Sequence, residues 1–173
     1  LASVVKVIKE ILADSPSESR LLIENSAGQK GKVCSNLEEI SWLLKEVDSE
    51  RLGWCFDTCH AFAAGYALGP DTKKTQKPKK ERNQRQGSAL EEISRLKLWS
   101  SLKLIHVNGS ASKFGSGRDK HANFGEGEIT KDALQHFLNH KQVKKIPLVT
   151  EVPGFAGKGP DQENIELLKE MIL

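Results

Sequence analysis

The chain has 173 residues, of which 26 are basic and 23 acidic, so its formal net charge is +3. Hydrophobic residues make up 38% of it, enough for one packed domain, and no apolar run is long enough to span a membrane. Its three cysteines are odd in number and do not suggest a disulfide framework, and Cys55 and Cys59 favour core packing over metal ligation. We therefore expect an intracellular globular protein that does not engage a membrane.

Short apolar runs alternate with patterns of helical period along the chain. Four apolar runs are each typical of a buried strand: residues 20–25, 53–57, 102–108 and 146–152. Apolar residues recur at helical spacing in five segments: residues 4–12, 37–44, 93–99, 134–138 and 165–172. Asn36 and Thr130 stand where helix N-caps belong, and Glu39 is placed as a capping-box partner for Asn36.

This alternation predicts the α/β class, with parallel strands covered by helices. Near-continuous apolar strands that close on a polar residue suit a TIM-type (β/α) barrel, whose active site lies at its C-terminal face. A complete (β/α)8 barrel typically has about 250 residues and eight strands. We therefore expect residues 1–173 to form a partial barrel of about four strands with covering helices.

Each predicted strand ends near a side chain that can bind a metal. These residues are Glu24, Asp57, His106 and Glu151. A single strand-end carboxylate often just caps the next helix, and a single histidine is often a hydrogen-bonded core residue. Four such side chains at four successive strand ends would converge on one mouth of a barrel and favour a metal site.

Two further segments supply the same kinds of ligand. His60 lies on the turn after the second strand, and the loop at residues 115–121 carries Asp119 and His121 two positions apart. Two imidazoles and one carboxylate are the ligand types of a catalytic zinc with an open position. Residues 124–127 then predict a tight turn that positions the loop, with backbone contact to a phosphate as the alternative.

Four segments together resemble endonuclease IV, the zinc-dependent apurinic/apyrimidinic endonuclease family. They are ENSAGQ at 24–29, DTCHAFAAGY at 57–66, DKH at 119–121 and GEG at 125–127. Their order and spacing agree along nearly the whole chain, from the first helix to the last. Members of that family are (β/α)8 barrels that bind three zinc ions. They cleave the phosphodiester bond 5′ to an abasic site. The predicted strands match the second half of that barrel.

The resemblance implies a role for each candidate ligand. Glu24 would bridge two zinc ions, and Glu24 and Glu151 are the expected catalytic residues. One of those two ions would also be held by Asp57, His106 and Glu151, and the third ion by His60, Asp119 and His121. In the family, the first half of the barrel gives two histidines to the first zinc. No histidine precedes Glu24 in this sequence, so we expect that zinc site to be incomplete.

The chemistry of phosphodiester hydrolysis agrees with this assignment. Zinc lowers the pKa of bound water to about 7 and neutralises charge on the phosphoryl oxygens. We therefore expect a base-excision-repair hydrolase whose partner is double-stranded DNA with abasic sites. Two alternatives remain open: a non-catalytic remnant that binds zinc or DNA, and a metal-dependent sugar isomerase. The third-metal set of His60, Asp119 and His121 argues against the isomerase.

Two features depart from the family pattern. Gly109-Ser110-Ala111 stand where the family usually has Asp-Ser-Lys, which removes an acidic and a basic side chain near the metal mouth. Residues 70–88 form a basic insertion, in which residues 71–86 carry seven cationic and two acidic side chains. A solvated flexible loop, a nuclear-import signal at residues 73–85 and a phosphate-binding arm are the alternatives. With the import signal at residues 73–85, we expect the protein in the nucleus if it comes from a eukaryote, and in the cytoplasm otherwise.

The first residue is Leu1 rather than methionine, so we expect a fragment, an incomplete gene model or a truncated product. A half barrel would expose apolar strand edges, which tend to associate. We therefore expect a missing N-terminal half, or self-association, to complete the barrel.

Overall fold

The computed structural model describes residues 1–69 and 87–173, so most of the basic insertion predicted at residues 70–88 lies outside the described residues. The helices are α1 (Ala2–Asp14), α2 (Leu37–Val47), α3 (Thr58–Ala64), α4 (Ala89–Arg95), α5 (Lys131–Leu138) and α6 (Gln162–Glu170), with short 3₁₀ turns at η1 (Leu98–Ser100) and η2 (Val143–Lys145). The strands are β1 (Leu21–Glu24), β2 (Leu52–Asp57), β3 (Leu102–His106), β4 (Gly109–Ser110), β5 (His121–Ala122) and β6 (Leu148–Val149). None of the described helices is long and apolar enough to cross a membrane.

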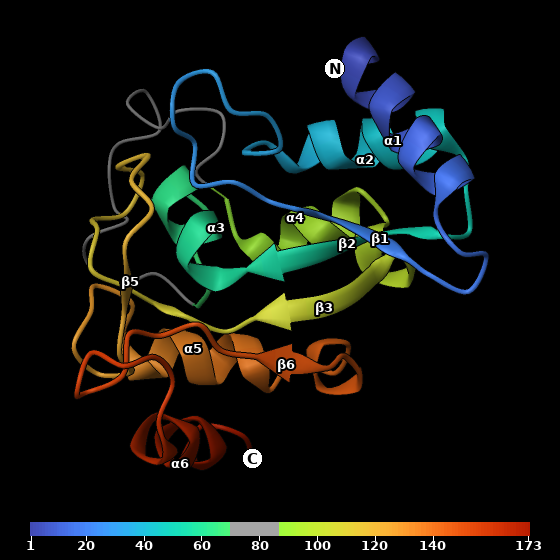
Figure 1. Cartoon of the computed structure of the whole chain (residues 1–173). Helices are drawn as coiled ribbons and strands as arrows, with labels where there is room; N and C mark the ends of the chain where they lie inside the picture. The colour runs from blue at the N-terminus through green and yellow to red at the C-terminus, as the bar shows by residue number, and fades with distance from the viewer. Residues whose placement is uncertain (70–86) are drawn as a thin grey trace, which may run out of the picture.

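Four parallel strands form the main sheet, in the order β1-β2-β3-β6 (Figure 1). Each strand pairs with the next one along the chain in that order, as neighbouring strands of a (β/α) barrel do. A second, two-stranded antiparallel sheet joins β4 to β5 just beyond the end of β3. The predicted α/β class and partial barrel are therefore confirmed.

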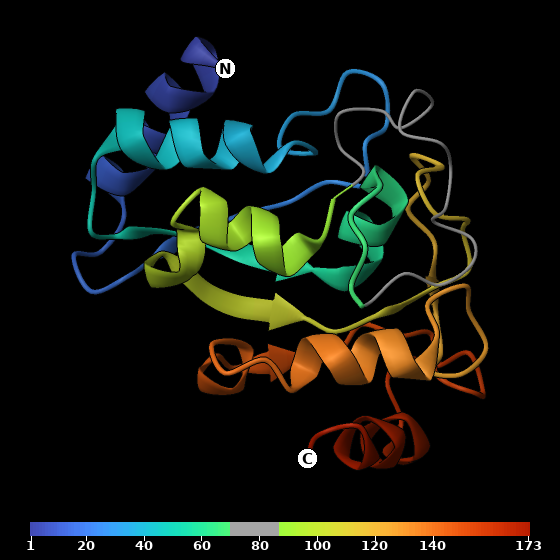
Figure 2. The same cartoon turned by 180° about the vertical axis from the view of Figure 1, so that it is seen from behind.

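Helices α2, α4 and α5 lie on one side of this sheet. Figure 2 shows α2, α4 and α5 in front of the strands, and Figure 1, turned by 180°, shows β1, β2 and β3 in front. Among the described residues, no helix lies across the strands on the side that faces the viewer in Figure 1. The chain therefore has the layering of a barrel wall, with strands on the inner side and helices on the outer side.

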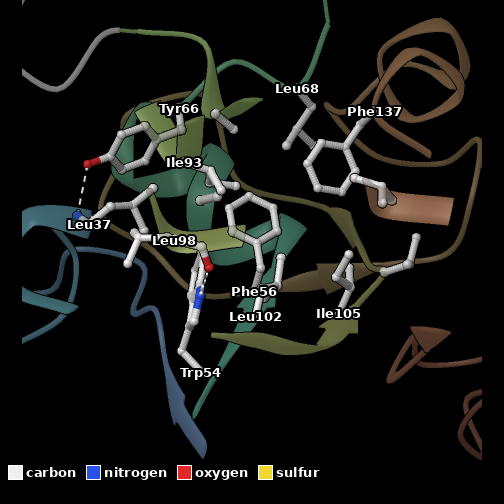
Figure 3. Close-up of a cluster of buried hydrophobic side chains, with 14 of the residues drawn as sticks. Leu37, Trp54, Phe56, Tyr66, Leu68, Ile93, Leu98, Leu102, Ile105 and Phe137 are labelled. Carbon is white, nitrogen blue, oxygen red and sulfur yellow. Dashed lines mark hydrogen bonds between the residues drawn. The ribbon is translucent and has the colours of Figure 1, made fainter. Parts of the chain in front are cut away.

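The hydrophobic core fills the space between the sheet and its helices (Figure 3). Trp54 and Phe56 of β2 point into it and are fully buried. The Phe56 ring stacks on Phe137 of α5 with 5.1 Å between ring centroids. The indole Nε1 of Trp54 donates a hydrogen bond of 3.0 Å to the carbonyl oxygen of Leu98, so burial leaves no unsatisfied polar atom on that ring.

Alternate residues of β2 face the other side of the sheet, because side chains alternate along a strand. These residues are Cys55 and Asp57. The strand register sets Glu24 beside Cys55 and His106 beside Asp57, so all four side chains share that face. Val149 of β6 lies beside His106 and is 45% exposed, as expected for a barrel interior that these four strands only partly enclose.

Side-chain caps fix where two helices begin. The side chain of Asn36 accepts a hydrogen bond of 3.0 Å from the backbone N–H of Glu38, and Thr130 caps α5, so both predicted N-caps are confirmed. The predicted capping box is wrong about Glu39, because its carboxylate does not bond the backbone N–H of Asn36. The Glu39 carboxylate accepts from the backbone N–H of Cys34 at 2.7 Å, two residues before the cap, and thereby holds the chain that leads into α2.

Two predicted elements have other bounds than expected: one helix begins and ends four residues earlier, and one strand is shorter. The helix predicted over residues 93–99 ends at Arg95, because Lys97 adopts a left-handed backbone with a φ of 57°. The strand predicted over residues 146–152 is reduced to Leu148–Val149. It pairs with β3 alone, so few ladder hydrogen bonds hold it in an extended conformation.

Candidate metal centre

All seven ligand candidates from the sequence gather at the carboxyl ends of the strands. Glu24, Asp57 and His106 are the last residues of β1, β2 and β3, and Glu151 follows two residues after β6. We call these four strand ends the carboxyl-end rim; in Figure 1 the arrowheads of β2 and β3 point toward it, beside α3. The other three come from α3 and the loop that runs into β5: His60, Asp119 and His121.

These side chains form two groups, in each of which the ligand atoms lie within 4.8 Å of one another. The first group comprises Glu24, Asp57, His106 and Glu151, and the second comprises His60, Asp119 and His121. The groups match the two sets of candidates that come from the strand ends and from the following segments. The first group offers four donor side chains and the second offers three. Imidazole nitrogen and carboxylate oxygen are donor types that zinc uses in proteins.

In the first group, three carboxylates surround one imidazole nitrogen. The Nδ1 atom of His106 lies 3.2 Å from Glu24 Oε1, 3.1 Å from Glu151 Oε2 and 4.0 Å from Asp57 Oδ2. Carboxylates this close together repel one another unless a proton or a metal ion lies among them. The first group therefore suits a cation.

In the second group, two histidines share one carboxylate. Asp119 Oδ2 lies 3.0 Å from His60 Nε2, and Asp119 Oδ1 lies 3.6 Å from His121 Nε2. The Nε2 atom of His121 is buried and has no hydrogen-bond partner among the described residues, although Asp57 Oδ2 is 3.7 Å away. A buried nitrogen without a partner is destabilising. A metal ion bound by these residues would satisfy it, so the residues fit the zinc that the resemblance implies.

Glu24 lies between the two groups. Its Oε1 atom is 3.3 Å from His60 Nδ1 and 3.2 Å from His106 Nδ1. Burial opposes ionisation, but hydrogen bonds from His60 and the two nearby imidazoles lower the pKa of the Glu24 carboxyl overall. Burial likewise opposes the charged form of His60, but Glu24, Asp57 and Asp119 outweigh it and raise the pKa of that imidazole to about 9. In the metal-free protein, a proton on His60 thus offsets part of the acidic charge.

Asp57 is fully buried and is the N-cap of α3 as well as a ligand candidate. Its Oδ1 atom accepts from the backbone N–H of His60 at 2.7 Å, and its Oδ2 atom accepts from Asn108 Nδ2 at 2.7 Å. Burial raises the pKa of Asp57, although His60 and the hydrogen bonds oppose this. Helix capping and ligand geometry are therefore compatible here, because each oxygen has lone pairs to spare.

Two buried asparagines at the rim were not assigned a role from the sequence. Asn25 Oδ1 accepts from the backbone N–H of Asp57 at 2.7 Å, and Asn25 Nδ2 donates to the Asp57 carbonyl oxygen at 3.1 Å. Asn108 Oδ1 accepts from the backbone N–H of Glu151 at 2.8 Å. The signal that could have found them is position, since Asn25 directly follows Glu24 and Asn108 lies two residues after a strand-end histidine.

Cys59 is fully buried, as predicted, and it also lies close to the ligand candidates. Its Sγ atom donates to the Lys120 carbonyl oxygen at 3.7 Å and lies within 4.8 Å of ligand atoms of Asp57 and His121. Burial raises the pKa of the Cys59 thiol to about 11, so the thiol is neutral at pH 7.

The predicted turn after the second group is present. Gly125 has a φ of 87°, and the backbone N–H of Glu126 donates to the Asn123 carbonyl oxygen at 3.2 Å. Gly109, at the first departure from the family pattern, is tightly packed. A Cβ atom there would lie 2.6 Å from the carbonyl oxygen of Ala122, so the pairing of β4 with β5 leaves no room for a side chain at this position.

The sequence model of the family described as "Xylose isomerase-like TIM barrel" matches residues 1–171. The "Probable endonuclease 4" of Halothermothrix orenii is 33% identical over 167 residues, which cover 96% of this chain and 56% of that protein. The "Probable endonuclease 4" of Methanoculleus marisnigri is 35% identical over 174 residues, covering 97% and 56% respectively. This chain thus spans about half the length of these curated relatives.

A solved structure gives the same result. The crystal structure of endonuclease IV from Thermus thermophilus superimposes with a TM-score of 0.72 at 26% identity, covering 96% of this chain and 57% of that one. The resemblance drawn from four sequence motifs is confirmed by these comparisons. The chain therefore belongs to the xylose isomerase-like TIM-barrel family, among relatives named endonuclease 4.

Proposed function

We propose that residues 1–173 are the part of a zinc-dependent apurinic/apyrimidinic endonuclease that carries most of its metal centre. The complete enzyme would cleave duplex DNA on the 5′ side of an abasic site. One observation carries this proposal: two adjacent groups of metal-ligand side chains meet at the carboxyl-end rim of a chain whose relatives are named endonuclease 4.

The contacts of Glu24 support a bridging role, since its Oε1 atom lies within 3.3 Å of an imidazole from each group. Around it, the first group would hold one zinc and the second group another, with the ligands Asp57, His106 and Glu151, and His60, Asp119 and His121. When bound, zinc supplies a water that ionises near pH 7 and neutralises charge on the phosphate.

Within the first group, exposure separates the side chains that can reach DNA from those that cannot. The Glu24 and Glu151 side chains are 36% and 48% exposed, whereas that of Asp57 is fully buried. We therefore assign Glu24 and Glu151 to the reacting centre, where they orient the attacking water, and Asp57 to holding the metal. The exposed mouth would receive the phosphate 5′ to the abasic nucleotide.

The chain spans about half the length of these curated relatives, and a complete barrel of this kind has eight strands. We propose that an N-terminal half, in the same polypeptide or in another chain, supplies the remaining strands. The further ligands that the family uses for its first zinc would come from that half. Activity is therefore best tested both on this chain and on its fusion to the N-terminal half of the Halothermothrix orenii relative.

The test is incision of a duplex that carries one synthetic abasic analogue, with zinc added. We expect incision 5′ to the lesion, abolished in Glu151→Gln and retained in Glu163→Gln, an exposed carboxylate of α6 with no place in either group. Absence of incision by both zinc-loaded proteins would contradict the proposal. Turnover of a sugar without incision would instead favour the isomerase alternative.

A further inference from the structure

Two buried asparagines at the carboxyl-end rim bond the ends of different strands, and one of them, Asn108, joins two strands that are not neighbours in the sheet. The backbone pairing of β3 with β6 ends at His106 and Val149, with one more hydrogen bond of 2.8 Å from the Val107 N–H to the Val149 carbonyl oxygen. Glu151 lies beyond that point, so the strand ladder does not fix its position. β2 and β6 are also not neighbours in the sheet, because β3 lies between them.

Asn108 makes the connection across β3. It is fully buried; its Nδ2 atom donates to Asp57 Oδ2 at 2.7 Å, and its Oδ1 atom accepts from the Glu151 backbone N–H at 2.8 Å. Its own backbone is held by Thr58, whose Oγ1 atom accepts from the Asn108 N–H at 2.8 Å and donates to the Asn108 carbonyl oxygen at 2.7 Å. One amide thus sets the separation of two acidic ligand candidates from β2 and β6.

Asn25 makes the matching connection between β1 and β2. It is 2% exposed, and both ends of its amide bond the backbone of Asp57, at 2.7 Å and 3.1 Å. The carbonyl oxygen of Asn25 also lies 2.9 Å from His60 Nδ1, which orients that ring. Asn25 therefore holds the backbone of Asp57, and Asn108 holds its side chain.

An amide is suited to this task because it is neutral. Asn108 Nδ2 orients the Asp57 carboxylate with a hydrogen bond but leaves its negative charge intact, whereas a lysine or arginine would neutralise it. Each Asp57 oxygen accepts one protein hydrogen bond, from His60 and Asn108 respectively, and keeps lone-pair capacity for a metal.

We infer that Asn25 and Asn108 are positioning residues, which set the spacing of the metal ligands across β1, β2 and β6 without contacting the metal or the DNA themselves. This inference rests on the proposed metal centre. A merely structural role would lower the stability of the fold, whereas positioning predicts a separate loss of metal affinity, because partners of metal ligands typically change affinity by about 10- to 100-fold.

Asn164 provides a matched control. It is also fully buried, and its side chain also joins separate segments: Oδ1 accepts from the Phe124 backbone N–H at 3.1 Å, and Nδ2 donates to Asn123 Oδ1 at 3.1 Å. It belongs to α6 and bonds no ligand candidate among the described residues. Asn164→Ala therefore removes a comparable amide without removing a hydrogen bond to any ligand candidate.

The experiment measures zinc affinity by competition with a chromophoric chelator, and the free energy of unfolding of the metal-free protein by urea titration. It uses the full chain as wild type, Asn108→Ala, Asn25→Ala and Asn164→Ala. We expect zinc affinity to fall about 10- to 100-fold in the first two variants and to remain unchanged in Asn164→Ala, although all three lose stability. The visible absorption of bound Co²⁺ should change in the two rim variants and not in Asn164→Ala.

Asn108→Ser is made as well, in case the alanine variant does not fold, because a hydroxyl keeps the space polar but is too short to reach both strands. Wild-type zinc affinity in folded Asn108→Ala or Asn108→Ser would overturn the inference and leave the proposed function standing. An equal loss of affinity in Asn164→Ala would also overturn it, because the effect would then follow general stability. A wild-type chain that binds no zinc would overturn the proposed function, and this inference with it.

Discussion

Two neighbouring residues of β2 are equally buried, but one lies among apolar side chains and the other among polar ones. Phe56 and Asp57 are both fully buried, the first against the helices and the second at the carboxyl-end rim. Burial of an apolar side chain such as Phe56 contributes about 1.5–3 kcal/mol to stability. Burial of Asp57 instead opposes its ionisation and raises its pKa. The extent of burial alone therefore does not distinguish a core residue from a site residue.

The environment makes the distinction. On the helix side, Phe56 stacks on another ring and needs no further partner. At the rim, carboxylates and imidazoles crowd together, and beside it the buried Nε2 atom of His121 has no hydrogen-bond partner in the part of the chain that the structure describes. The helix side is packed with apolar side chains, whereas the donor atoms at the rim are of the kind that suits a cation. Mutations on the two sides should therefore have separable effects.

The largest expected effect on stability comes from the helix side. Phe56→Ala removes a fully buried ring and should lower the free energy of unfolding by about 3–5 kcal/mol, as measured by urea titration. Val7→Ala, at a side chain of α1 that is 51% exposed, should change it by less than about 0.5 kcal/mol. Equal effects of the two substitutions would contradict the assignment of the core.

A substitution at the rim should change zinc affinity strongly and the free energy of unfolding little. The Glu151 side chain is 48% exposed and only its backbone N–H is bonded by Asn108, so Glu151→Gln should change the free energy of unfolding by less than about 0.5 kcal/mol. The same variant should lose at least about tenfold in zinc affinity, measured by equilibrium dialysis. Unchanged zinc affinity would remove Glu151 from the ligand set.

Much of this site could be predicted from the sequence because parallel strands end on the same edge of a sheet. Once the apolar runs are recognised, Glu24, Asp57 and His106 must lie together. The asparagine contacts could not be predicted in this way, because Asn25 and Asn108 bond partners 32, 43 and 51 residues away in the sequence. Such contacts depend on the packed backbone, not on a local pattern.

Element ends were predicted less well than the elements themselves. Hydrophobic periodicity continues through Leu96 to Trp99, but the helix stops earlier because Lys97 turns left-handed. The last strand is short because only β3 pairs with it, and the sequence does not show which strand is at an edge. Both differences come from tertiary context.

A smaller effect is expected at a helix cap away from the rim. Asn36 caps α2 as Asp57 caps α3, but it belongs to neither ligand group. Asn36→Ala should lower the free energy of unfolding by about 1 kcal/mol with zinc affinity unchanged, and Asn36→Ser, which keeps an accepting oxygen, should restore most of it. A loss of zinc affinity in Asn36→Ala would show that the two regions are not separable.

The smallest effect is expected for the thiols, which the structure keeps unreactive on both sides of the sheet. Burial raises the pKa of Cys34 to about 11 and of Cys55 to about 12. Because the thiolate is the reactive form, a raised pKa reduces the reactive fraction at pH 8. Iodoacetamide should therefore react slowly at pH 8 with the folded chain and fully in urea, and faster as the pH rises toward 11. Rapid alkylation of the folded protein at pH 8 would contradict this burial.

The most direct test of the metal centre is anomalous diffraction at the zinc edge from crystals of the zinc-loaded chain. We expect one peak at the carboxyl-end rim, among Glu24, Asp57, His106 and Glu151, and one beside the rim, among His60, Asp119 and His121. Peaks only at other positions, or none in zinc-saturated crystals, would contradict the account.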